Sequence, residues 1–406
     1  MLLCSYAIFK IPFFKNSLIG WWLLLAIFFI KIISGFAFGW FYQLPQYYST
    51  ADTWRFYHLS LKETDWLLKD PTAFIKDLFS YGYNKPGNIF SGSNSYWNDL
   101  KSNVFVKLMA IINVLSHNNY YVNIILFNFL FMFGLMGIYR VLSTVYINKK
   151  WLLILGVFLI PSSLFWCSGI HKDGLILSAT GLIIYHFYQS LNKNHFSLKS
   201  VLIIIICLAL IFTLRNYVTL ALLPGLFCLW ISYKNPEKKK WIFPIIYIAG
   251  IMLFFTLSHL IPSLDFPGFI INKQQEFISL SGGSSIKIEP LQPGFINFFK
   301  YLPTALDMAF FRPHLSEAKS PAALLAFFEI VLVFSTLVLF FLFPEKNIQT
   351  PAVTWFLFFF SISILVLAGY TITFSGAIVR YRSFVMPLAI TPLLCQINWN
   401  CILRRK

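Results

Sequence analysis

Charged residues are scarce in this sequence, and acidic residues are scarcer than basic ones. Only 12% of the 406 residues are charged, whereas soluble domains carry about 25%. The chain has 15 acidic and 32 basic residues, which gives a net charge of +17. Hydrophobic residues make up 58% of it, and its mean hydropathy is +0.70. This composition excludes an ordinary soluble domain and predicts a multi-pass membrane protein.

The sequence also lacks a disulfide framework and a metal-ligand motif. Its six cysteines lie in or beside apolar runs or near the termini, and none lies in a long polar loop. No spacing of Cys, His, Asp or Glu that is typical of a metal site occurs. The first 17 residues contain Lys10 and Lys15 but no small-residue cleavage site. We therefore expect a retained, cytoplasmic N-terminus rather than a signal peptide.

Long apolar runs predict the fold class, an all-α, polytopic transmembrane bundle of about ten spans that forms a single transmembrane domain over residues 1–406. Residues 200–233 would make one helix of roughly 51 Å, which is too long for a bilayer core. Because Arg215-Asn216-Tyr217 interrupts that run, we expect a hairpin of two spans there. The expected spans are 18–42, 120–143, 151–170, 174–190, 200–214, 217–233, 241–261, 321–343, 351–371 and 383–402.

The distribution of basic residues tests this topology independently. With the N-terminus inside, the inner segments hold 15 basic and 2 acidic residues, a net charge of +13. The outer segments hold 16 basic and 13 acidic residues, a net charge of +3. This asymmetry follows the positive-inside rule and places both termini in the cytoplasm. The basic residues therefore reflect the topology, with anionic lipid as a partner, and they do not indicate nucleic-acid binding.

Two long outer loops, residues 43–119 and 262–320, carry helical patterns of their own. In the first loop we expect a helix over 52–70 and a second amphipathic helix over 103–116. The second of these is about 13 residues long, so it is too short to span and should lie in the membrane interface. In the other loop, residues 295–310 form an apolar stripe at helical spacing. That loop is a candidate lid over a site at the outer face.

Asp52 is the candidate catalytic residue, because it follows the first expected span and lies beside an aromatic cluster. A carboxylate held at the membrane face is suited to act as a general base toward a hydroxyl group. The alternative is an acid at a helix N-terminus, where the helix dipole stabilises it. Arg55, Tyr57 and His58 follow in the same stretch and are candidates to support the site.

His171, Lys172 and Asp173 place three ionisable residues between two apolar runs, at the outer face in the expected topology. We interpret His171 and Lys172 as candidates to bind a phosphate or pyrophosphate, with Asp173 orienting one of them. The alternative is a solvated turn with a snorkelling lysine. A turn of that kind usually contains Asn, Gly or Ser, so the three charges favour a further role.

Four arginines are the other candidates to bind a phosphate, because arginine binds phosphate through two parallel hydrogen bonds. Each has a simpler alternative, as a cap on helix carbonyls or as an anchor in the headgroup region. Glu317 is an alternative base, and Tyr381 lies between two of the arginines. The four arginines are Arg215, Arg312, Arg380 and Arg382.

Five stretches of the chain carry a resemblance to a known family. They are Ala51-Asp52-Thr-Trp-Arg-Phe-Tyr57-His58, the helical stretches 53–80 and 103–116, the segment from Pro161 to Asp173, and Arg380-Tyr-Arg382 with Pro387. This arrangement resembles the C-type (GT-C) membrane glycosyltransferases, and in particular uncharacterised bacterial members. The resemblance covers most of the chain, although its motifs are short.

The resemblance implies an enzyme that uses a polyprenyl-phosphate-linked sugar donor and acts on a glycan, lipid or protein acceptor at the outer face of the membrane. Asp52 would be the general base of an inverting transfer, in cell-envelope polysaccharide biosynthesis. Some members bind a divalent metal through paired acids. Asp52 has no acidic neighbour in its motif, so no metal or other cofactor is expected.

Two alternatives remain open at this point. A polysaccharide polymerase or O-antigen ligase also uses outer-face arginines and a long outer loop, around polyprenyl-pyrophosphate glycans. The acid and the amphipathic helices lie in the first loop here, which is less typical of that class. A lipid or glycolipid transporter should show inverted repeats and ionisable residues near the midplane of the membrane. The sequence has no such repeat, and its ionisable clusters gather at one face.

Overall fold

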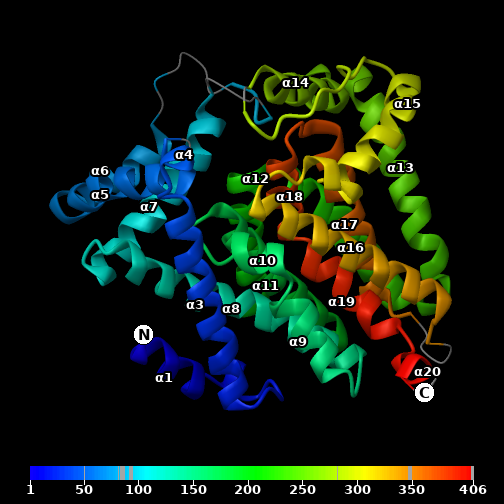
Figure 1. Ribbon diagram of the computed structural model, residues 1–406, viewed down its shortest axis with the longest axis horizontal. Coiled ribbons are helices and arrows are strands. Elements are labelled where there is room, and N and C mark those ends of the chain that lie inside the picture. The colour runs from blue at the N-terminus through cyan, green and yellow to red at the C-terminus, as the bar shows by residue number, and fades with distance from the viewer. Residues whose placement is uncertain are drawn as a thin grey trace. The chain divides into compact units, whose positions relative to one another are not determined.

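The computed structural model describes residues 1–49, 51–80, 82, 87–90, 95–280, 282–345 and 350–403. Within these ranges the secondary structure is helical, with two isolated β-bridges and no strand (Figure 1). The all-α class is therefore confirmed for this part of the chain. Lys346 and the C-terminal Arg404, Arg405 and Lys406, which contributed to the charge comparison, lie outside the described residues. So do residues 83–86 and 91–94 of the first outer loop.

The chain divides into two compact units. Unit 1 comprises Met1–Thr144 and Ser163–Tyr217, and unit 2 comprises Val145–Ser162 and Val218–Lys406. Three helices begin in one unit and end in the other, namely α8 (Tyr120–Val145), α10 (Pro161–Trp166) and α12 (Leu198–Lys234). The other elements of unit 1 are α1 (Leu2–Lys10), α2 (Pro12–Lys15), α3 (Trp21–Phe41), α4 (Pro45–Tyr48), α5 (Asp52–Lys69), α6 (Pro71–Lys76), η1 (Asp77–Phe79), α7 (Tyr96–Ser116) and α11 (Lys172–Asn192).

Unit 2 begins with a short helix and contains most of the C-terminal half of the chain. Its elements are α9 (Lys150–Phe158), η2 (Pro236–Lys238), α13 (Lys239–Leu260), η3 (Pro262–Leu264), α14 (Phe266–Ser279), α15 (Phe295–Leu306), η4 (Asp307–Phe311), η5 (Leu315–Glu317), α16 (Pro321–Leu342), α17 (Ala352–Thr371), α18 (Ser375–Ser383), α19 (Met386–Gln396) and α20 (Trp399–Leu403).

Six helices in the described ranges are long and apolar enough to cross a membrane. They are α3, α8, α12, α13 together with η2, α16 and α17, and the pair α18 and α19, bent by 68°, makes a seventh if it counts as one span. These helices support a multi-pass membrane protein. The expected count of ten spans is not confirmed.

Two of the expected spans are not single helices. Residues 151–170 form α9, of 9 residues, and α10, of 6 residues. At 1.5 Å per residue neither is long enough to cross a bilayer, and the break falls before Pro161, whose ring and missing N–H end the preceding helix. Residues 383–402 were also expected to form one span, but α19 ends at Gln396 and has only 11 residues.

Residues 200–233 were expected to form a hairpin of two spans; the interruption at Arg215 is present, but the hairpin is not confirmed, because these residues lie in one candidate span, α12. Helical geometry is broken at Arg215, with φ −152° and ψ 85°, inside the apolar stretch of α12. The helix expected over 52–70 is also present as α5. The helix expected over 103–116 is longer than the apolar pattern, because α7 begins at Tyr96. There the side chain of Ser95 accepts a hydrogen bond from the backbone N–H of Asn98 and caps the helix.

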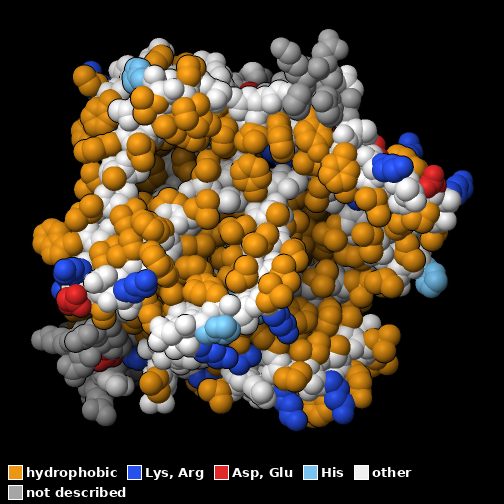
Figure 2. Space-filling view, turned by 180° about the vertical axis from the view of Figure 1, so that it is seen from behind, with side chains coloured by type: hydrophobic (Ala, Val, Ile, Leu, Met, Phe, Trp, Pro, Cys, Tyr) orange, Lys and Arg blue, Asp and Glu red, His pale blue; other side chains and the backbone are white. Residues whose placement is uncertain are grey.

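Hydrophobic side chains are exposed on the faces of several candidate spans. Figure 2 shows such side chains covering much of the face in view. Among the 18 most apolar consecutive residues of each helix, only 6% are buried within the protein in α13 with η2, and only 11% in α16. A helix that is apolar on its exposed faces is suited to a lipid environment rather than to water.

Small residues bring α8 and α11 into close contact in unit 1. A Cβ atom at Gly134 would collide with the backbone of Ser178, and a Cβ atom at Gly181 would collide with the backbone of Gly134. Close backbone approach of this kind is typical of helix pairs in membranes. It fixes the position of α11, and therefore of the three ionisable residues at its N-terminus.

A buried polar network joins α5 to α7 and α8. The amide of Asn113 donates to Ser60 Oγ at 2.8 Å and to Thr64 Oγ1 at 3.0 Å, and Asn123 donates to Asn113 Oδ1 at 2.5 Å. Lys107 forms ion pairs with Glu63 at 2.7 Å and with Asp77, the latter at 3.1 Å. These contacts hold α5 and α7 side by side (Figure 1).

Candidate functional site

His171 begins α11 as its N-cap residue. Its ring Nδ1 accepts from the backbone N–H of Asp173 at 3.3 Å. The segment before it is held by two buried side chains. Lys31 in α3 donates to Ser168 Oγ at 2.8 Å, and Asn128 in α8 donates to the Ser168 carbonyl oxygen at 2.7 Å. The buried lysine of the first span therefore has a structural role, because it fixes the segment that presents His171.

Four side chains of unit 1 form a continuous series of charged contacts. His171 Nε2 lies 3.9 Å from Asp52 Oδ2, and His171 Nδ1 lies 2.7 Å from Asp173 Oδ2. Arg215 Nη2 lies 2.5 Å from Asp173 Oδ1. The structure thus brings together four residues that are spread over 164 positions of the sequence, from Asp52 to Arg215.

Burial decreases along this series toward Asp52. The side chain of Asp173 is fully buried and that of His171 is 2% exposed, whereas that of Asp52 is 41% exposed. Asp52 is the first residue of α5, so the positive end of the helix dipole stabilises its charge. Asp52 is therefore an accessible carboxylate that contacts a buried histidine and, through it, a buried aspartate.

Both contacts of His171 Nδ1 are with Asp173, the backbone N–H at 3.3 Å and the carboxylate Oδ2 at 2.7 Å. Nδ1 accepts in the first contact and donates in the second, so the two contacts belong to different tautomers; in the tautomer that donates to the carboxylate, Nε2 is unprotonated and faces Asp52. A carboxylate behind a histidine fixes the orientation of the ring. The geometry is therefore suited to moving or sharing a proton at Asp52.

Arg215 is engaged within unit 1. Its Nη1 donates to the hydroxyl of Tyr217 at 3.0 Å while its Nη2 contacts Asp173, and its side chain is 7% exposed. We expected it to bind a phosphate directly. The contacts instead make it the counter-ion of Asp173, which a buried carboxylate requires.

The remaining candidates of the first loop lie around this series. Lys172 Nζ lies over the ring of Phe56 in α5, 4.9 Å from its centroid. Tyr57 donates to the Asn118 carbonyl oxygen at 2.5 Å, and burial raises the pKa of its phenol, so it remains a donor. His58 contacts the Tyr48 hydroxyl at 3.1 Å and is exposed, as is Arg55.

A second charged group lies in unit 2. Arg312 Nε donates to Asp307 Oδ2 at 2.9 Å, and its Nη1 forms an ion pair with Glu317. His314 Nε2 lies 2.9 Å from the other oxygen of Asp307. Glu317 therefore acts as a partner of Arg312. Asp307 is a residue of this group that the sequence did not single out.

Arg382 is linked to this group through the backbone. It is 2% exposed, and its Nη1 donates to the Arg312 carbonyl oxygen at 2.7 Å. The ring of Tyr381 lies 6.2 Å from that of Phe277. Arg380 is half-buried on the same helix, α18.

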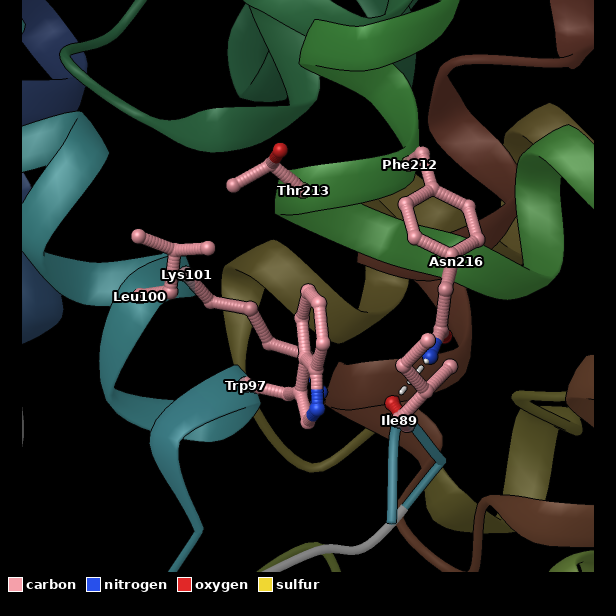
Figure 3. A pocket seen from close by; sticks show the side chains of 7 residues that line it. All are labelled: Ile89, Trp97, Leu100, Lys101, Phe212, Thr213 and Asn216. Atoms are coloured by element: carbon pink, nitrogen blue, oxygen red, sulfur yellow. Dashed lines mark hydrogen bonds between the residues drawn. The ribbon is translucent and has the colours of Figure 1, made fainter. Parts of the chain in front are cut away.

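A small pocket lies beside Asn216 in unit 1. Figure 3 shows Trp97 and Lys101 from α7 near Phe212 and Asn216 from α12, with Asn216 donating to the Ile89 carbonyl oxygen at 2.8 Å. The pocket has a volume of about 10 Å³, which is close to the minimum for one water molecule. It is too small for a sugar or a lipid, and the hydrogen bond from Asn216 to Ile89 joins the first loop to α12 beside it.

The described residues contain no group of three or more His, Cys, Asp or Glu side chains arranged to hold a metal ion. The comparisons with known proteins found no match: no family model, no curated protein and no solved structure is similar to this chain.

Proposed function

We infer that the chain is an integral-membrane glycosyltransferase that moves a sugar from a polyprenyl-phosphate donor to an acceptor hydroxyl. The observation that carries this proposal is the series Asp52, His171, Asp173 and Arg215, in which a partly exposed carboxylate is backed by a buried proton-sharing support. Such a base suits a substrate whose hydroxyl needs to lose a proton.

In the proposed reaction, Asp52 accepts a hydrogen bond from the acceptor hydroxyl. The acceptor oxygen forms a bond to the anomeric carbon of the donor sugar while the bond from that carbon to the phosphate oxygen breaks. The electron pair of the broken bond goes to the phosphate, and the hydroxyl proton goes to Asp52. One displacement of this kind inverts the anomeric carbon.

His171 is proposed to stabilise the site through both ring nitrogens. Asp173 and Arg215 hold the ring, and Nε2 can take a share of the proton that reaches Asp52. Lys172 follows His171 in the chain and is the proposed cation for the donor phosphate. Since Arg215 is held by Asp173, its proposed role is to maintain the charge of that carboxylate rather than to bind the donor.

The proposal also includes a placement in the membrane. Both termini lie in the cytoplasm, Asp52 lies at the outer face of the inner membrane, and α5 and α7 lie in the interface. The charge asymmetry of the sequence and the exposed apolar faces of the candidate spans support this placement.

The test is a transfer assay with purified protein and a panel of radiolabelled polyprenyl-phosphate sugars. Asp52→Asn keeps the shape of the side chain and removes its charge, so it should lower turnover by about 10²–10⁴-fold. The matched control is Asp65→Asn, an exposed acid on the same helix, which should leave turnover unchanged. Transfer by the Asp52→Asn protein at the rate of the control would show that the base lies elsewhere.

A further inference from the structure

Unit 2 contains a cavity of about 180 Å³, lined by residues of η4, α16, α17, α18 and α19. Its walls are mostly apolar, with side chains such as Val333, Leu337 and Ile390. Three polar residues also line it, namely Glu329, Ser361 and Arg382. They are respectively 5%, 1% and 2% exposed. A cavity of about 150 Å³ with apolar walls is large enough to bind a small apolar molecule.

The polar side chains at this cavity have hydrogen-bonding atoms without a partner in the described residues. Arg382 uses Nη1 on the Arg312 carbonyl, but its Nε and Nη2 have no hydrogen bond. Glu329 Oε2 accepts from the Ser162 N–H at 2.6 Å, but Oε1 has no donor. Ser361 Oγ also has no partner. Buried polar atoms are rarely left unsatisfied, so a molecule that supplies both acceptor and donor is expected here.

The charges at the cavity decide which class of molecule fits. Arg382 is a cation and Glu329 is an anion, so the polar end is neutral as a whole. Adding a charged head would leave one buried charge uncompensated, which is costly in an apolar surrounding. A neutral hydroxyl group accepts from the guanidinium through its oxygen and donates its proton to the carboxylate or to Ser361.

We propose that this cavity binds an apolar alcohol, with its hydroxyl between Arg382 and Glu329 and its hydrocarbon part against the apolar walls. The route of entry is lateral. Phe358, which lines the cavity from the candidate span α17, is 44% exposed. A long-chain or isoprenoid alcohol dissolved in the membrane therefore reaches the site from the hydrocarbon. This inference concerns unit 2 and does not rest on the proposed transfer.

The experiment uses the full-length protein in detergent and an alkanol of about twelve carbons that carries a terminal diazirine. After irradiation, mass spectrometry of peptides should place the label on α16, α17 or α19. Decanol should displace the probe at a concentration about tenfold or more lower than decane does. Decane has no hydroxyl group and therefore cannot form hydrogen bonds to the charged side chains. Decanoate should compete less well than decanol.

Variants separate the polar end from the apolar walls. Arg382→Gln should reduce labelling by about tenfold or more, and Ala389→Phe should reduce it by filling the cavity. Arg380→Gln is the matched control, since that residue lies on the same helix but does not line the cavity. If Arg382→Gln does not fold, the competition with the wild-type protein still decides the question.

Three outcomes would overturn the proposal. Equal competition by decane and decanol would mean apolar partitioning with only water at the polar end. Stronger competition by decanoate would mean a site for an anion. Labelling that maps to other helices, or that is the same in Arg382→Gln and Arg380→Gln, would mean that the alcohol binds elsewhere.

Discussion

Each unit contains a charged group built from arginine, carboxylate and histidine, but the two groups differ in their exposure to solvent. In unit 1 the side chains of Asp173, His171 and Arg215 are 0%, 2% and 7% exposed. In unit 2 those of Arg312, Glu317, Asp307 and His314 are 19%, 23%, 33% and 41% exposed. The same residue types therefore lie in two different dielectric environments.

The difference in burial changes what the contacts contribute. A buried charge that loses its partner remains uncompensated, and removing one partner of a buried pair typically costs about 3–5 kcal/mol. An exposed charge that loses its partner is solvated by water, and the pair contributes about 0–1 kcal/mol. The unit 1 group should therefore control the stability of its surroundings, whereas the unit 2 group should tolerate substitution.

The largest expected effect comes from breaking the buried pair in unit 1. Arg215→Met leaves Asp173 charged and without its counter-ion, so the free energy of unfolding should fall by about 3–5 kcal/mol. Chemical unfolding in detergent micelles measures this change. The double variant Arg215→Met with Asp173→Leu removes both charges and should recover part of the loss. A loss below about 1 kcal/mol in the single variant would contradict the assigned pairing.

His171 allows its capping role to be separated from its chemical role. His171→Asn keeps an N-cap side chain for α11, whereas His171→Ala removes it. The alanine variant should be about 1 kcal/mol less stable than the asparagine variant. Both should lose sugar transfer, since neither has an imidazole beside Asp52. Normal transfer by a stable His171→Asn protein would leave His171 with a capping role alone.

A smaller effect is expected for the more exposed group of unit 2. Arg312→Gln should lower the free energy of unfolding by about 1 kcal/mol or less, because water can solvate Asp307 and Glu317. Added salt should reduce the difference between this variant and the wild type. An effect as large as that of Arg215→Met would mean that burial does not distinguish the two groups.

The smallest effect should come from an ion pair on the surface of α14. Lys273 Nζ lies 2.6 Å from Glu276 Oε2, with side chains 48% and 41% exposed. Lys273→Gln should change the free energy of unfolding by about 0.2–0.5 kcal/mol. This variant gives the baseline for exposed pairs, measured by the same unfolding method. A change above about 1 kcal/mol would raise that baseline to the level expected for Arg312.

The sequence predicted those helices and breaks that depend on residues close together in the chain. The interruption at Arg215 followed from a polar residue inside a run too long for one span, and α5 followed from its acidic N-terminus and its Asp70-Pro71 end. The start of α7 was predicted too late. The helix begins at Tyr96 after the capping residue Ser95, whereas the apolar repeat that predicted it begins only near residue 103. The expected span 151–170 was wrong, since the run is apolar throughout but Pro161 divides it.

The candidate site was predicted in part. Scarce ionisable residues in an apolar chain are conspicuous, so Asp52, His171, Asp173 and Arg215 were all selected. Their relations were not predicted, because Arg215 forms an ion pair with Asp173, which lies 42 positions away. Similarly, Asp307 and Glu317 have no sequence signal that marks them as partners of Arg312.

Helical structure, apolar candidate spans and a low content of charge follow from the order of residues along the chain, because each residue contributes its own transfer energy and backbone preference. Which charges neutralise one another, and which remain accessible, follows from the folded arrangement. That outcome depends on burial and on distances of a few ångströms between residues far apart in the chain, and an interaction between two charges changes several-fold with the dielectric around them. The exposed carboxylate of Asp52 and the paired guanidinium of Arg215 illustrate the two outcomes.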